Sequence, residues 1–210
     1  MTSSAPSLSA AVAGMVVAGG RSTRFGGEKA AALLQGRPLL AWAVERLEHS
    51  CGEVAVNARP GTETEALARA AGLQVLHDAP GDADGPLAGV KAGLRWAMAR
   101  GAALLAVSPC DAPLLPDDLF ARLIEAAGSG AAIAVTEEGR QPLCAVWPVD
   151  ALPRLDAAMA GGAHPPTWRM LEQLGARQVR FDPPEAFANI NTRDDLQAAT
   201  RSLAEPTRAD

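Results

Sequence analysis

Short apolar runs alternate with longer amphipathic segments along most of this chain, and this alternation limits the possible folds. Runs such as AVAGMVV (residues 11–17) and ALLAVSP (103–109) are typical of strands buried on both faces. The segments between them carry apolar residues at helical spacing, as Leu87, Val90 and Leu94 do. Strands separated by helices form parallel βαβ units. We therefore predict an α/β fold, a three-layer Rossmann-like and mostly parallel sheet with helices on both faces.

Composition narrows the class of protein. Hydrophobic residues make up 48% of the 210, enough for one domain, which we expect over residues 12–203 with tails at 1–11 and 204–210. The formal net charge of −5 without a Lys/Arg run argues against a nucleic-acid partner. We find no membrane-span pattern and no signal-peptide pattern, and the three cysteines have no metal-ligand spacing. We expect a cytoplasmic protein without a membrane partner.

Glycines and polar residues follow the predicted strands, at the carboxyl ends where open α/β sheets bind ligands. Gly19 and Gly20 follow the first strand, Asn57 the second, Asp78 the third and Asp111 the fourth. Each residue alone could be an ordinary turn or cap residue. Their joint placement favours a ligand site at this edge of the sheet.

The glycine-rich segment VVAGGRSTRFGGEK (residues 16–29) matches neither common nucleotide-binding motif. A P-loop would need Ser or Thr after Lys29, where the chain has Ala30, and the G-x-G-x-x-G fingerprint of redox dinucleotide-binding proteins is absent. The glycines still allow backbone N–H groups to approach phosphate closely. Arg24 and Lys29 can supply cationic donors, whereas Arg21 could equally be a solvated loop charge.

This segment resembles the signature of nucleotidyltransferases, and most of all that of the MobA-type molybdenum cofactor guanylyltransferases. Four further blocks continue the resemblance in order along the chain: AVNARP, GPLAGVKAGL, SPCDAPLLPDDL and NINTRDDL. The doublet AGG is similar to the guanylyl branch, since cytidylyl relatives usually show AAG. Alternatives are a molybdopterin cytidylyltransferase, another nucleotidyltransferase acting on a small-molecule phosphate, and a non-catalytic nucleotide-binding module.

The resemblance implies transfer of GMP from GTP to the terminal phosphate of molybdopterin, with release of pyrophosphate and with Mg²⁺ as cofactor. It also suggests molybdenum-insertion or molybdoenzyme-maturation proteins as partners. The catalytic residues it implies are Lys29, Arg24 and Asp111, with Asp111 as the metal ligand. The nucleotide-binding residues it implies are Val17, Ala18, Gly19, Gly20, Arg24, Lys29, Asn57, Asp78 and Asp111, and the acceptor-binding residues are Asn189 and Asn191.

Simpler roles remain open for several of these residues. Asp111 could form a turn before Pro113, and the Asn-x-Asn segment could precede a helix that Thr192 caps with Asp195 three residues on. We expect Cys110 to be a small buried hydrophobe and not a nucleophile, because no histidine stands near it in the sequence as a base.

Three departures from the family pattern are visible. Glu28 stands where the family usually has aspartate, and Gln141 stands where an enterobacterial relative would have histidine before proline. The segment GGAHPPTWRMLEQLG (residues 161–175) lacks the paired basic residues expected to contact a pterin phosphate, which leaves His164 and Arg169 as candidates. The nucleotide-binding half of the site is therefore better supported than the acceptor-binding half.

Overall fold

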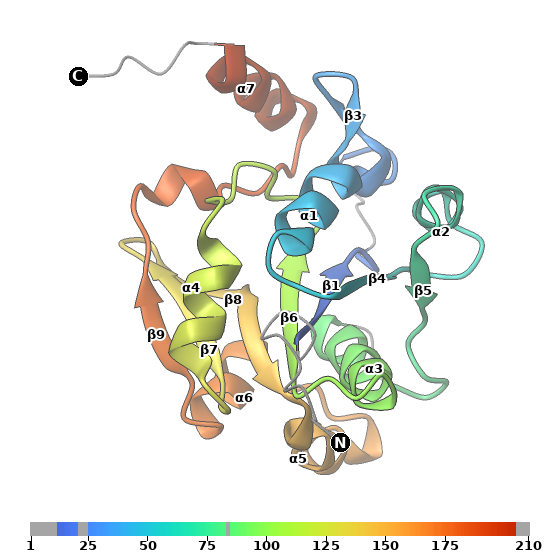
Figure 1. The fold of residues 1–210 in the computed structure, drawn as a ribbon. Coiled ribbons are helices and arrows are strands. Elements are labelled where there is room, and N and C mark those ends of the chain that lie inside the picture. Colours follow the sequence, from blue (N-terminus) through green and yellow to red (C-terminus); the bar gives the residue numbers. More distant parts are fainter. Residues whose placement is uncertain (1–11, 21–24, 83–84, 205–210) are drawn as a thin grey trace, which may run out of the picture.

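A computed structural model describes residues 12–20, 25–82 and 85–204 (Figure 1). Its main sheet has seven strands in the order β5-β4-β1-β6-β8-β7-β9. Strand β8 runs antiparallel to both β6 and β7, and the other pairings in this sheet are parallel. The predicted α/β class with a mostly parallel sheet is confirmed. The strands are β1 (Val12–Val17), β4 (Glu53–Asn57), β5 (Gln74–Leu76), β6 (Leu104–Pro109), β7 (Ala132–Thr136), β8 (Gly139–Pro148) and β9 (Arg177–Arg180).

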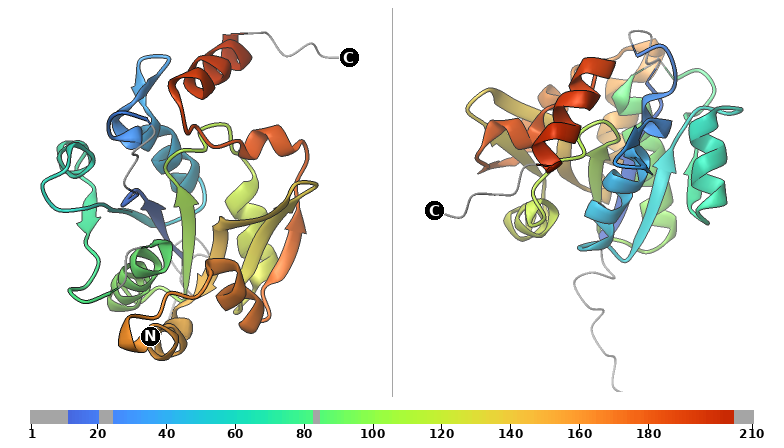
Figure 2. Two further views of the ribbon diagram at one scale, coloured as in Figure 1. Left: turned by 180° about the vertical axis from the view of Figure 1, so that it is seen from behind. Right: turned by 90° about the horizontal axis from the view of Figure 1, so that it is seen from above.

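Helices cover both faces of this sheet, as predicted (Figure 2). Side chains alternate between the faces along each strand, so Met15 and Val16 of β1 belong to opposite layers of the core. One layer packs under α1 (Leu39–Glu48), α2 (Glu63–Ala70) and α4 (Leu119–Ala127). The other packs under α3 (Pro86–Ala99), α5 (Leu152–Ala158) and α6 (Thr167–Gln173).

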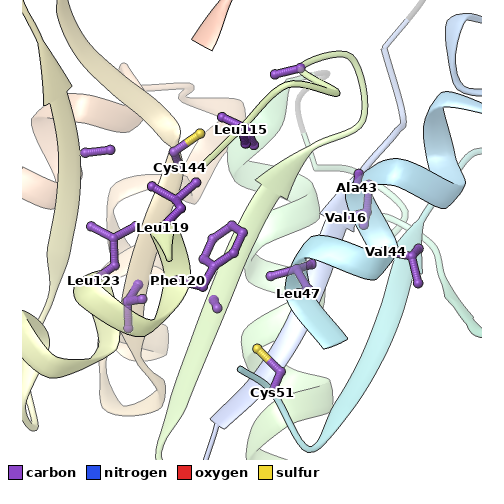
Figure 3. Packing of buried hydrophobic residues seen from close by; sticks show 14 of the residues in the cluster. Val16, Ala43, Val44, Leu47, Cys51, Leu115, Leu119, Phe120, Leu123 and Cys144 are labelled. Carbon is purple, nitrogen blue, oxygen red and sulfur yellow. The ribbon is translucent and has the colours of Figure 1, made fainter. Parts of the chain in front are cut away.

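The layer beneath α1 and α4 holds large side chains from both helices (Figure 3). Leu47 of α1 and Phe120 and Leu123 of α4 are fully buried over the central strands. Burying a leucine or phenylalanine side chain contributes about 1.5–3 kcal/mol to stability. The central strands are thereby held as a rigid base for the loops at their carboxyl ends.

A smaller unit lies beyond one end of the sheet, and its hairpin, unlike its helix, was not predicted from the sequence. The hairpin of β2 (Leu33–Leu34) and β3 (Arg37–Pro38) packs beside α7 (Arg193–Ala204), with Phe25, Leu34 and Ile190 among the buried residues of their shared cluster. Short 3-10 helices complete the described chain: η2 (Lys29–Ala31), η3 (Val149–Ala151), η4 (Ala160–Gly162) and η5 (Pro184–Phe187). The predicted tails lie outside the described residues, except that Ala204 ends α7.

The order of the strands determines where a ligand can bind. The chain leaves β1 to build β4 and β5 on one side and then returns to place β6 on the other side. Such a switch point opens a crevice at the carboxyl ends of the strands. Among the described residues, no helix has the length and apolar character that crossing a membrane requires.

Candidate active site

A cleft of about 850 Å³ opens at the carboxyl ends of β1, β4 and β6. Arg24 lies outside the described residues, and Asn189 is exposed and does not line the cleft. The other predicted site residues all line it: Val17, Ala18, Gly19, Gly20, Lys29, Asn57, Asp78, Asp111 and Asn191. The structure therefore gathers residues that are far apart in the sequence into one cavity.

Lys29 connects three distant parts of the chain. Its Nζ donates to Asp111 Oδ2 at 2.9 Å and to Asn191 Oδ1 at 2.7 Å. Lys29 begins η2, Asp111 follows β6, and Asn191 lies just before α7. The side chains of Lys29 and Asp111 keep 15% and 21% of their surface exposed, so a ligand can reach this ion pair from the cleft.

Asn57 and Asp78 form a second polar pair in the cleft. Asn57 is buried at 3% exposure, and its Nδ2 donates to Asp78 Oδ1 at 2.9 Å. Gly89 of α3 lies so close that an added Cβ would stand 2.4 Å from Asn57 Oδ1. The glycine thus makes room for the amide, and the amide fixes the orientation of the Asp78 carboxylate.

Arg59 also lines the cleft, although sequence reasoning did not single it out. Its Nε donates to the carbonyl oxygen of Gly19 at 2.7 Å and so holds the start of the glycine loop. Arg59 lies two residues after Asn57, the last residue of β4, within the AVNARP block. This position just beyond a strand end could have identified it as a site residue.

Glu28 has a structural role that its place beside Lys29 did not suggest. Its carboxylate accepts hydrogen bonds from the backbone of Glu63 and from Thr64, at the N-terminus of α2. Burial by itself would raise the pKa of Glu28, but these hydrogen bonds and the charge of nearby Arg59 outweigh it, so the pKa is lowered. Glu28 is therefore held in the charged form at neutral pH.

Two oxygen atoms near Lys29 are suitable ligands for a hard cation. Asp111 Oδ2 and Asn191 Oδ1 both contact the same ammonium group, so they converge on one point where positive charge is favourable. Among the described residues, no group of three or more His, Cys, Asp or Glu side chains could hold a metal ion. A Mg²⁺ ion binds with few protein oxygens when phosphate and water complete its octahedron, so this donor set fits that ion.

Cys110 is not suited to be a nucleophile. Burial and the negative charge of neighbouring Asp111 raise the pKa of its thiol to about 12, so the thiolate is absent at neutral pH. The expectation that Cys110 is not a nucleophile agrees with this pKa, whereas the expectation that it is buried is wrong, because Cys110 is partly exposed and lines the cleft.

His164 and Arg169, the two candidates for contact with a pterin phosphate, lie in different surroundings. His164 packs against Gly85, which lines the cleft, and an added Cβ on Gly85 would stand 2.0 Å from His164 Nε2. Arg169 is exposed on α6 and does not line the cleft. Gln141 of β8 donates to Thr136 Oγ1 at 3.4 Å. On this side, β8 adds Leu143 to the cleft wall.

Thr192 caps the last helix, and Asp195 is its capping partner three residues on. Asp195 Oδ2 accepts from the backbone N–H groups of Asn191 and Thr192, each at 2.8 Å, and the Asp195 N–H donates to Thr192 Oγ1. This reciprocal arrangement fixes the segment that brings Asn191 to Lys29. The capping role and the cleft position therefore belong to neighbouring residues and do not exclude each other.

Comparison with known proteins agrees with this geometry. Residues 14–179 match the model of the MobA-like NTP transferase domain. A molybdenum cofactor guanylyltransferase from Cereibacter sphaeroides is 40% identical over 192 residues, covering 90% of this chain and 96% of that protein. One from Cupriavidus necator is 39% identical over 196 residues, covering 89% of this chain and 94% of that protein.

The fold is also similar to a solved structure. The molybdopterin-guanine dinucleotide biosynthesis protein A from Archaeoglobus fulgidus superposes with a TM-score of 0.73 at 24% sequence identity. The match covers 91% of this chain and 98% of the Archaeoglobus chain. The shared architecture therefore extends over nearly the whole of both chains.

Proposed function

Because this chain belongs to the MobA-like NTP transferase family, we propose that it transfers GMP from GTP to the terminal phosphate of molybdopterin. An oxygen of that phosphate attacks the α-phosphorus of GTP, the bond from the α-phosphorus to the bridging oxygen breaks, and pyrophosphate leaves. The proposal is supported by guanylyltransferase relatives that match about 90% of the chain. It makes this protein an enzyme of molybdenum cofactor biosynthesis.

The observation that carries the proposal is the position of Lys29 in a cleft walled by glycines. Phosphoryl-type transfer depends on positioning and on neutralisation of charge more than on covalent help from the protein. Lys29 supplies the positive charge to the triphosphate, and Gly19 and Gly20 let the backbone approach it. Arg24 is proposed as a second cationic donor on the strength of the sequence alone.

Recognition of the nucleoside is assigned to the Asn57–Asp78 pair, together with Val17 and Ala18. Asp78 is an acceptor that suits ribose hydroxyls or the N–H groups of guanine. Its carboxylate is held by Asn57, which reduces the entropy lost when a nucleoside binds. The position of the Asn57–Asp78 pair supports this role, because the pair lines the same cleft as Lys29 and lies at the other end of the glycine loop.

Enzymes of this family generally use a divalent metal ion, and we propose Mg²⁺ for this one. Asp111 is the proposed protein ligand, and Asn191 offers a second oxygen beside it. When bound, Mg²⁺ supplies neutralisation of the charge that develops on the phosphates. Asn191 and Asn189 are also proposed to contact the acceptor, and only Asn191 has the support of a position in the cleft.

The substrates proposed from the relatives are GTP and molybdopterin. Proteins of molybdenum insertion or of molybdoenzyme maturation are the proposed partners that supply and receive the cofactor. We propose the cytoplasm as the compartment, which is consistent with three free cysteines.

Pyrophosphate release tests the proposal directly. Purified protein is incubated with Mg²⁺, a molybdopterin acceptor and either GTP or CTP, with the Asp111→Asn variant as the control. Release with GTP and not with CTP supports guanylyl transfer, and the control should show little release. Release with CTP alone would assign the protein to cytidylyl transfer, and release with neither would overturn the proposal.

A further inference from the structure

Glu28 joins the glycine loop to a helix that is distant in the sequence. Its Oε1 accepts from the backbone N–H of Glu63 at 3.0 Å. Its Oε2 accepts from the backbone N–H of Thr64 at 2.6 Å and from Thr64 Oγ1 at 2.5 Å. Three hydrogen bonds on one carboxylate fix the place of Glu28 relative to α2.

These bonds satisfy donors that a helix leaves open at its start. The first N–H groups of an α-helix have no partner within the helix. In α2, Thr62 Oγ1 accepts from the N–H of Glu65 at 3.2 Å, and Glu28 takes those of Glu63 and Thr64. The N-terminus of α2 lies at the cleft and would otherwise attract phosphate. Glu28 fills that position, so the triphosphate is left to the glycine loop and Lys29.

The backbone carries this attachment directly to the proposed catalytic lysine. Glu28 is the residue before η2, with φ −77° and ψ 114°, and Lys29 is the first residue of η2. With Glu28 fixed on α2, the start of the Lys29 side chain is fixed as well. From there, Lys29 Nζ reaches Asp111 and Asn191 at 2.9 and 2.7 Å.

We propose that Glu28 is a positioning residue, which holds Lys29 at its place in the cleft by binding the N-terminus of α2. The effect on turnover rests on the proposed function, because it needs Lys29 to neutralise the triphosphate. Glu28 contacts both Glu63 and Thr64, and its side chain is one methylene longer than the aspartate that the family usually has here.

A matched control exists on the same helix. Glu65 is also a carboxylate at the start of α2, and it accepts from the backbone of Gly61 at 2.6 Å and from Arg69 at 2.7 Å. No hydrogen bond of Glu65 reaches the described part of the glycine loop. If Glu28 only stabilised α2, the variants Glu28→Ala and Glu65→Ala would have similar effects on activity.

Steady-state kinetics separates the two roles. We expect Glu28→Ala to lower kcat at least about tenfold, because small misplacements of a reacting group are costly, while KM for GTP changes less than about threefold. Glu28→Asp should recover part of kcat, because a charged carboxylate remains near α2. Glu65→Ala should keep kcat within about twofold. Wild-type kcat in Glu28→Ala, or an equal loss in Glu65→Ala, would overturn the inference.

A second measurement does not depend on activity. The chain has two lysines, Lys29 and Lys91, so labelling of each amine by acetic anhydride can be followed by mass spectrometry. We expect Lys29 to be acetylated several-fold faster in Glu28→Ala than in the wild type, with Lys91 unchanged as the internal control. Unchanged labelling of Lys29 would overturn the inference. If Lys29 is labelled faster in Glu28→Ala but the wild type releases no pyrophosphate, the proposed function is overturned and the role of Glu28 stands.

Discussion

The two lysines of this protein each pair with an aspartate, yet their surroundings differ. Lys29 and Asp111 keep 15% and 21% of their side-chain surface exposed, and they lie in the cleft. Lys91 of α3 pairs with Asp82 and, at 3.5 Å, with Asp156 of α5, and its side chain is 8% exposed. The exposed fractions of the two lysines are similar, so burial alone does not distinguish a site from a structural ion pair.

The two ion pairs differ in what surrounds them. Lys29 faces glycines and an open cavity, where a phosphate can replace its present contacts. Lys91 is enclosed by the packing of α3 against α5 and by two carboxylates. Elsewhere the chain uses arginine for its cations, seventeen times. The two lysines are thus used at two different places, one at the proposed ligand site and one in the packing between α3 and its neighbours.

The largest effect is expected at the structural pair. Lys91→Met leaves Asp82 buried without its cation and should lower the free energy of unfolding by about 3–5 kcal/mol. Denaturant titration measures the change. The double variant Lys91→Met, Asp82→Asn removes both charges and should regain much of the loss. If the double variant is as unstable as the single one, the ion pair is not the cause.

At the cleft pair, the effect should be on rate and not on stability. Lys29→Ala or Asp111→Asn is expected to reduce turnover about 10²–10³-fold, the usual cost of losing one well-placed electrostatic group. Pyrophosphate release gives the rate, and thermal unfolding should show that the fold persists. Turnover at the wild-type level in either variant would remove that residue from the proposed mechanism.

Two glycines of α3 show the same contrast between a position at the cleft and a position in the core. A Cβ on Gly89 would stand 2.4 Å from Asn57 Oδ1 in the cleft, and one on Gly93 would stand 2.5 Å from Met15 Sδ in the core. Gly89→Ala should displace Asn57 and raise KM for GTP about tenfold, a change of about 1.4 kcal/mol. Gly93→Ala should leave KM unchanged and cost about 1–3 kcal/mol of stability through overpacking. Equal KM values for the two variants would contradict the assignment of Asn57.

The smallest effect is a pH dependence from Glu28. Its pKa is lowered in the folded protein from an ordinary value of 4.5, because hydrogen bonds from Thr64 and Glu63 and the charge of Arg59 outweigh burial. The unfolded chain then takes up the proton first as the pH falls, so the stabilisation by Glu28 is complete above about pH 4.5 and declines below it. The difference in melting temperature between wild type and Glu28→Gln should therefore shrink below that pH. A difference that stays constant down to pH 3.5 would show that the charge of Glu28 is not involved.

The sequence predicted the parallel half of the sheet and its cleft residues well. Apolar runs predict strands, and the carboxyl-end rule places Gly19, Asn57 and Asp111 together without further information. The reversed direction of β8 was not predicted, although only Glu137 and Glu138 separate it from β7 and a connection that short joins antiparallel strands. The two-residue strands β2 and β3 are too short to show any periodicity.

Contacts between residues that are far apart in the sequence were also not predicted. Glu28 meets Thr64 at a separation of 36 residues, and a glutamate in a loop gives no sign of which helix it will cap. Asn191 meets Lys29 at a separation of 162 residues and was expected only from the family resemblance. Local patterns identify such residues as polar and exposed in loops, and only the tertiary fold decides their partners.

The arrangement around Lys29 also makes the cleft depend on a segment that is synthesised well after the rest of its wall. The Asp111 carbonyl oxygen accepts from the N–H of Ile190 at 2.7 Å, and Asn191 next to it contacts Lys29. A growing chain that has reached residue 111 has supplied the glycine loop and Asp111 and still lacks this last segment. Fragments that end before residue 190, whether from interrupted synthesis or from proteolysis, therefore lack Asn191, which contacts Lys29 in the cleft. The cleft is complete only in molecules that include residues 190 and 191.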